Sequence, residues 1–210
     1  MSLDRNALLS PRQCALVVHE CQRGVIGDLA GIPDLARAAR HGMLPAIADL
    51  VRGGREAGVS IIHCTAIRRP DGRGANTNAR LFGHMRKVDH PLLCDSESAA
   101  IVEEISVEES DFVLPRLHGL SSFHGTELDA ILRNLGVRTL VGVGVSVNVA
   151  IQSFAFDAIN NGYRVVLPRD AVAGFPEHYV DAVFEHTLAA LATVLHSREV
   201  LDIWRRTKPS

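Results

Sequence analysis

The 210-residue sequence has few of the features that mark secreted, membrane-spanning or nucleic-acid-binding proteins. Its four cysteines show no C-x-x-C spacing, so they indicate neither a disulfide framework nor a zinc site. No segment approaches the roughly 20 apolar residues that cross a bilayer, and the N-terminus has no signal-type apolar core. The formal net charge is −2 and the basic residues are scattered, which argues against nucleic acid or an anionic membrane as a partner. We therefore expect a cytoplasmic location.

What the sequence does contain is enough apolar material for one sizeable core. Hydrophobic residues make up 47% of the chain, and no low-complexity stretch or linker interrupts it. We expect a loose N-terminal arm over residues 1–12 and one domain over residues 13–210. Short β-branched apolar runs predict strands at Ala15–His19, Val59–Cys64, Asp111–Leu114, Thr139–Val143, Arg164–Leu167 and Thr193–His196. Segments of helical period predict helices at Pro33–Ala57, Thr126–Leu135, Asn148–Asn161, Glu177–Ala192 and Arg198–Arg205.

The alternation of strands and helices predicts an α/β fold. Gly58, Gly136 and Gly162 each follow a predicted helix and precede a strand, where a left-handed C-cap is favoured. Right-handed crossovers then give a six-stranded, mostly parallel, doubly wound sheet with helices on both faces. A nucleotide-binding Rossmann domain is less favoured, because V-G-V-G-V-S follows the fourth strand and lacks the G-x-G-x-x-G spacing.

Ligands of such sheets bind at the carboxyl ends of the strands. Four predicted strand ends carry Glu20, Thr65, Arg116 and the turn Ser146–Ala150. The turn leads into a helix N-terminus, whose N–H groups and dipole suit an anion or a developing oxyanion. A nucleophile would be expected about one turn into this helix, but Ala150 has no functional group.

The stretch from Gly144 to Gly174 resembles the signature of the isochorismatase-like hydrolase superfamily, G-x-x-T-x-x-C-V followed by a helix, G-Y and a D-A pair. That superfamily includes cysteine amidohydrolases acting on nicotinamide, carbamoyl and ureido substrates. The resemblance places Val147 at the threonine position and Ala150 at the nucleophilic cysteine. It also places Glu20 at the general base, normally Asp, and Arg116 at or next to the lysine. A non-proline cis peptide is expected at Ser146–Val147.

Alanine excludes the covalent cysteine mechanism. A Cys→Ala substitution made to trap a complex is one explanation, although the altered base and lysine favour native divergence. Isochorismatases of the superfamily also lack the cysteine and rely on the acid. By that analogy Glu20 acts as a general acid or base and Arg116 binds a carboxylate, giving a hydrolase of a small, anionic molecule. The alternative is that Glu20 and Arg116 simply pair, leaving an inactive paralogue that binds a small molecule or serves in assembly.

The remaining candidates for substrate binding come from loops and from the turn. The long segment Arg68–Phe82 carries paired amides and could cap the pocket or be a solvated linker. The candidate residues are Gln22, Asn76, Asn78, His118, Phe123, Ser146, Val147 and Val149.

We expect no metal and no cofactor. His19 and His63 end adjacent predicted strands, but buried hydrogen-bonded histidines are the commoner explanation. Cys14, Cys64 and Cys21 are interpreted as small core residues, Cys21 despite its place beside Glu20. The resemblance implies a homo-oligomer, a dimer or a tetramer.

Overall fold

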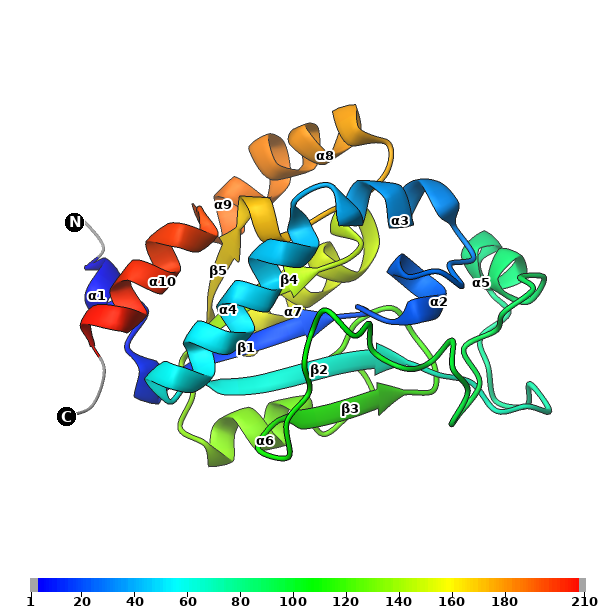
Figure 1. Cartoon of the computed structure of the whole chain (residues 1–210), viewed down its shortest axis with the longest axis horizontal. Helices are drawn as coiled ribbons and strands as arrows, with labels where there is room; N and C mark the ends of the chain where they lie inside the picture. The colour runs from blue at the N-terminus through cyan, green and yellow to red at the C-terminus, as the bar shows by residue number, and fades with distance from the viewer. Residues whose placement is uncertain (1–3, 208–210) are drawn as a thin grey trace.

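A six-stranded parallel sheet forms the centre of the protein. The computed structural model describes residues 4–207, and the strand order is β3-β2-β1-β4-β5-β6. All five pairings are parallel, so the carboxyl ends of the strands meet at one edge (Figure 1). This confirms the predicted fold class. The strands are β1 (Cys14–His19), β2 (Ser60–Ala66), β3 (Phe112–Arg116), β4 (Thr139–Gly144), β5 (Arg164–Pro168) and β6 (Thr193–Leu195).

The two central strands are buried on both faces, as their unbroken apolar runs predict. Every residue of β1 and β4 is buried, which is typical of a parallel sheet covered by helices. β1 pairs with β2 through Val18 and His63 and with β4 through Val18 and Val143. The end of β1 is therefore held from both sides, and the residue that follows it has a fixed position.

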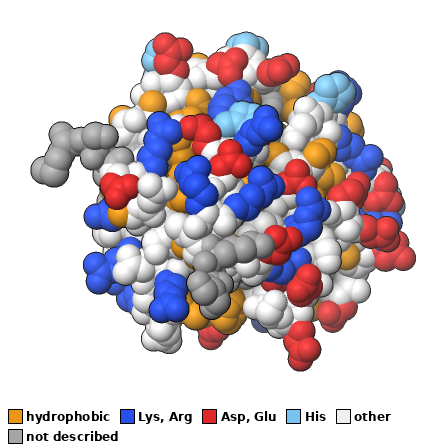
Figure 2. Space-filling view, turned by 60° about the vertical axis from the view of Figure 1, so that its left-hand side comes forward, with side chains coloured by type: hydrophobic (Ala, Val, Ile, Leu, Met, Phe, Trp, Pro, Cys, Tyr) orange, Lys and Arg blue, Asp and Glu red, His pale blue; other side chains and the backbone are white. Residues whose placement is uncertain are grey.

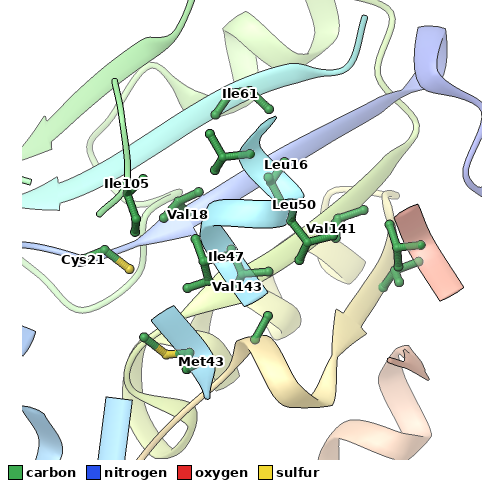
Figure 3. Close-up of a cluster of buried hydrophobic side chains, with 14 of the residues drawn as sticks. Leu16, Val18, Cys21, Met43, Ile47, Leu50, Ile61, Ile105, Val141 and Val143 are labelled. Carbon is green, nitrogen blue, oxygen red and sulfur yellow. The ribbon is translucent and has the colours of Figure 1, made fainter. Parts of the chain in front are cut away.

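Helices cover both faces of the sheet. One face packs against α3 (Pro33–Arg40), α4 (Met43–Ala57) and α10 (Ser197–Arg206), and the other against α6 (Leu128–Asn134), α7 (Gln152–Asn160) and α8 (Glu177–Val183). Figure 3 shows Ile47 and Leu50 of α4 lying against side chains of β1 and β4. The remaining helical segments are α1 (Arg5–Leu8), η1 (Pro11–Gln13), α2 (Arg23–Ile26), α5 (Arg80–Met85), η2 (Val147–Ile151), η3 (Arg169–Ala171), η4 (Phe184–Leu188) and α9 (Ala189–Leu191).

The predicted helices differ from the observed ones mainly in continuity. The run predicted over Pro33–Ala57 breaks before α4, where Gly42 has φ 132°, a conformation that favours glycine. The run over Glu177–Ala192 contains the π-helical turn η4 between α8 and α9. The three predicted C-cap glycines do have positive φ, at 79°, 69° and 86°.

The segment expected as a loose arm is packed in the structure. Within residues 4–12, Asp4 caps α1 by accepting a hydrogen bond from the Asn6 amide, and Leu8 and Leu9 are buried in the core. These two leucines bring enough apolar surface to hold a short segment in place. Residues 1–3 of that arm and residues 208–210 of the predicted domain lie outside the described residues.

The surface carries mixed charge. On the face shown in Figure 2, basic and acidic side chains are interspersed rather than gathered by sign. None of the described helices is long and apolar enough to cross a membrane.

Candidate functional site

A pocket of about 380 Å³ lies at the carboxyl edge of the sheet. Its floor includes Glu20 after β1, Arg116 at the end of β3, and Ser146 and Ala150 after β4. Its walls come from the α2–α3 region, from α5 and from Leu117–Leu120. In Figure 1, α2 and α5 lie beyond the arrowheads of β1 and β2. The strand ends predicted to converge on a site therefore do so at three of four positions. Thr65 is the exception, since it is buried and lines a separate hollow together with Val113 and most residues between positions 99 and 107.

Glu20 and Arg116 form an ion pair on the pocket floor. The Arg116 Nη2 donates to Glu20 Oε1 at 2.5 Å, and Arg116 Nε donates to the Gly119 carbonyl at 3.2 Å. The side chains are 7% exposed for Arg116 and 18% for Glu20. Glu20 has φ 52°, and its amide donates to the Cys64 carbonyl at 2.9 Å. The backbone turn after β1 thus directs this carboxylate into the pocket instead of continuing the strand.

The turn after β4 is the most tightly built part of the floor. Gly144 has φ 108°, and a Cβ placed there would lie 2.2 Å from the His19 carbonyl oxygen. The cis peptide lies at Val145–Ser146, one bond earlier than expected. η2 then begins, placing Ala150 on the pocket floor at 4% exposure. The methyl group of Ala150 therefore occupies the position predicted for a nucleophile in the turn.

Gln22 is buried just behind the floor and does not line the pocket. Its Nε2 donates to the carbonyls of Ala66 at 2.9 Å and Ala99 at 2.8 Å, and its Oε1 accepts from the Ala66 amide at 2.8 Å. All three bonds are to backbone. Gln22 joins the end of β2 to the chain near Ala99, so its contacts are structural ones.

The other loop candidates divide between the pocket and its surroundings. Asn76 lines the pocket, and its Oδ1 accepts from the Gly119 amide at 2.7 Å. His118 also lines it, whereas Asn78 is exposed and lies outside it. Phe123, expected as a pocket wall, stacks on Phe154 with ring centroids 5.8 Å apart. Phe123 is partly buried against the core cluster that includes residues of α7, and it does not line the pocket.

Sequence comparison identifies the family. The profile described as the isochorismatase domain matches residues 14–199. The chain belongs to the isochorismatase family. It is 31% identical over 179 residues to the ureidoacrylate amidohydrolase RutB of Rhizobium rhizogenes, covering 78% of this chain and 71% of that one. Two solved structures are similar at 26% identity. One is an isochorismatase family protein from Desulfovibrio vulgaris, with TM-score 0.80 over 93% of this chain and 100% of the other. The second is N-carbamoylsarcosine amidase from Thermoplasma acidophilum, with TM-score 0.70 over 88% and 96%.

No cysteine of this isochorismatase-family protein lines the described pocket. Cys21 and Cys64 are buried, and burial raises the pKa of both thiols, that of Cys64 to about 12. Cys14 is a core residue of the same kind, and Cys94 is exposed and does not line the pocket. A thiolate is the reactive form of cysteine, so none of these residues brings a reactive sulfur to the pocket floor.

Two further residues of the turn after β4 differ in whether they line the pocket. Val149 lines the pocket together with Asn148. Val147 is fully buried, and a Cβ added at Gly174 would lie 2.6 Å from its Cγ1. The side chain of Val147, predicted to bind substrate, is thus turned toward the core.

His19 is a buried neutral base behind the floor. Burial, together with the nearby charge of Arg116, lowers its pKa to about 3. Its ring packs on Phe154 with centroids 4.5 Å apart, and its Nε2 has no hydrogen-bond partner within residues 4–207. Over that same range, no group of three or more His, Cys, Asp or Glu side chains could hold a metal ion.

Sequence reasoning missed much of the pocket wall. Val25, Ile32 and Leu35 come from the α2–α3 region, and Leu81, Phe82 and Met85 come from α5. Arg68 and Arg86 also line the pocket. The segment Arg68–Phe82, expected either to cap the pocket or to be a solvated linker, contributes Arg68, Leu81 and Phe82 to the lining, although these residues were not predicted individually. The apolar wall residues carry the same signal as core residues, so only their place in the fold distinguishes them. The cavity they enclose is largely apolar with a few polar groups, as ligand pockets generally are.

Proposed function

We propose that this protein hydrolyses a small, anionic molecule without a covalent cysteine intermediate. The observation that carries the proposal is that Glu20, Arg116 and Ala150 line one pocket in a chain of the isochorismatase family. The carboxylate and the cation are kept where the nucleophile is replaced by a methyl group. Two similar proteins are named for a ureidoacrylate and for N-carbamoylsarcosine, which makes carbamoyl and ureido compounds the first substrates to test.

The chemistry requires only a water molecule and Glu20. The carboxylate accepts a proton from water while the water oxygen bonds to the electrophilic carbon of the substrate. The bond to the leaving group then breaks, and Glu20 returns the proton to it, so that one water is consumed. The N-terminal end of the η2–α7 run, which reaches the pocket through Ser146 and Asn148, favours the developing negative charge. Arg116 holds Glu20 in place by the 2.5 Å hydrogen bond.

The test compares the parent protein with Glu20→Gln on a panel of ureido, carbamoyl, ester, amide and enol-ether compounds. Glutamine keeps the shape of the side chain and cannot exchange the proton, so we expect a loss of about 10²–10⁴-fold in kcat/KM. Glu104→Gln, at an exposed position outside the pocket, is the matched control and should keep the parent rate. Equal rates for Glu20→Gln and the parent would refute the proposal.

The Glu20–Arg116 ion pair favours a second candidate function, non-catalytic binding. The Oε1 of this carboxylate is already bound by the Nη2 of a buried guanidinium, as expected of a side chain that serves to build the pocket floor. In that case the parent would bind panel compounds, seen as a rise in Tm, and would turn none over. Product formation by the parent, lost in Glu20→Gln, would exclude this candidate.

Three further properties stay predictions. We propose a homo-oligomer, a cytoplasmic location, and activity that needs no added cofactor. Sedimentation velocity on the purified protein tests the first, fractionation of the source cells the second, and assay after dialysis against a chelator the third.

A further inference from the structure

Arg68 is a cation in the pocket without a counter-charge. It is half-buried and lines the cavity. Its Nη1 donates to the Met85 carbonyl at 3.1 Å, and no carboxylate among residues 4–207 lies within ion-pair distance of it. The neighbouring Arg69 differs, because it is exposed and paired with Asp71 at 2.8 Å. A partly buried guanidinium with donors to spare is suited to an anion with two acceptor oxygens.

Arg116 is less suited to that task. Its charge is balanced by Glu20, and its Nε is bound to the Gly119 carbonyl. An anion placed on Arg116 would also meet the negative charge of Glu20. Arg116, which the sequence analysis assigned to binding a substrate carboxylate, is therefore paired with Glu20 on the pocket floor. Arg68 is the better candidate for binding an anion.

Arg68 lies further beyond the carboxyl edge of the sheet than Arg116 does. Ala66 is opposite Arg116 in the β2–β3 register, and Arg68 follows it by two residues in a bridge to Leu93. At the rise of an extended chain, its Cα lies roughly 7 Å beyond that level, toward α5. The exposed Arg86 adds positive charge at the same wall. Leu81, Phe82 and Leu92 give the same pocket an apolar lining.

We propose that Arg68 binds the carboxylate of the ligand and that the ligand is an amphipathic acid. Its apolar body fills the space between α5 and the α2–α3 region, and its reacting group lies at Glu20. The inference rests on the proposed function in using the same pocket. It adds that specificity for a carboxylate comes from Arg68 rather than from Arg116. Among the described residues that line the pocket, Arg68 is the half-buried arginine without a carboxylate partner, whereas Arg86 is exposed to solvent. A carboxylate, with one charge, therefore matches Arg68 better than a doubly charged phosphate does.

The test measures binding of phenylalkanoic acids of three to five carbons in the side chain and of their neutral amides, by isothermal titration calorimetry. We expect the parent to bind the best acid at least about tenfold more tightly than its amide, as a charge-assisted pair implies. Arg68→Gln should remove this preference, and Arg68→Lys should keep part of it because the charge remains. Arg69→Gln is the matched control and should keep the full preference. Circular dichroism and Tm verify that each variant is folded.

The outcomes separate this inference from the proposed hydrolysis. An acid preference lost only in Arg68→Gln supports the inference even if Glu20→Gln hydrolyses as fast as the parent, which would refute the hydrolase alone. The inference is overturned if no acid binds more tightly than its amide, if Arg68→Gln keeps the preference, or if Arg69→Gln loses it equally. Tighter binding of the matching phenylalkyl phosphates than of the acids would overturn the carboxylate assignment.

Discussion

The Glu20–Arg116 pair predicts a large energetic coupling between two pocket residues. The guanidinium and carboxylate are 93% and 82% removed from solvent, from side-chain exposures of 7% and 18%. At a charge separation of about 4 Å and an effective dielectric constant of about 20, their attraction is about 4 kcal/mol. Desolvation offsets part of it, and removing one partner leaves a buried charge, at a cost of about 3–5 kcal/mol.

A double-mutant cycle measures the coupling directly. Glu20→Gln and Arg116→Gln should each lower the free energy of unfolding, and the double variant should lose much less than their sum. We expect a coupling of about 2–4 kcal/mol. Urea unfolding can be followed by the fluorescence of Trp204, the single tryptophan, which is fully buried.

An exposed ion pair provides the control for this cycle. Asp34 and Arg37 lie on α3 with side-chain exposures of 45% and 72%, and such pairs couple by less than about 1 kcal/mol. A coupling that small for Glu20 and Arg116 would refute the argument. It would also mean that Glu20 is free to act as a base without displacing its partner.

Three further results are expected. Ala150→Cys should become alkylated by iodoacetamide at a second site besides the exposed Cys94, because position 150 lines the pocket, and mass spectrometry showing one adduct would contradict this. His19 has a pKa lowered to about 3 by burial and by the charge of Arg116, so its stabilising effect is present above the unfolded pKa of about 6.5 and is lost as pH falls toward 3. Urea unfolding of His19→Gln between pH 7 and 4 should therefore show a weaker pH dependence than the parent, and an unchanged slope would count against the burial argument. Gly144→Ala should lower the free energy of unfolding by more than about 1 kcal/mol, since a Cβ there would collide with the His19 carbonyl at φ 108°; a Tm equal to that of the parent would be inconsistent with the tight turn.

The strands could be predicted from the sequence because they are buried on both faces. β1 was expected at Ala15–His19 and β4 at Thr139–Val143, each within one residue of the observed ends. A strand covered on both sides has an unbroken apolar run, which is a strong local signal. The break at Gly42 was missed, since the apolar period of α3 continues into α4 and hides a change of direction.

The site could be predicted best where a residue's place follows from its position at a strand end. Glu20, Arg116 and Ala150 were predicted from the strand ends and from the family resemblance, and they do share a pocket. Asn76 and His118, predicted from two loops, line the same pocket. α5 was missed because none of its residues is buried, so it has no apolar period. Arg68 was missed for a different reason. Some arginines pair with a carboxylate close in sequence, as Arg69 does with Asp71, but Arg116 pairs with Glu20 96 residues away. A local pattern therefore does not show that Arg68 lacks a counter-charge among the described residues.

The construction of α5 has a consequence for how this chain can change its ligand. Leu81, Phe82 and Met85 line the pocket, yet none of them belongs to the buried core. Gln22, by contrast, ties the strand ends beneath the floor through three backbone hydrogen bonds. Substitutions in α5 can therefore accumulate with little loss of folding stability, while the floor tolerates few. Ligand specificity can therefore change during evolution, or be redesigned, through α5 while the pocket floor stays the same.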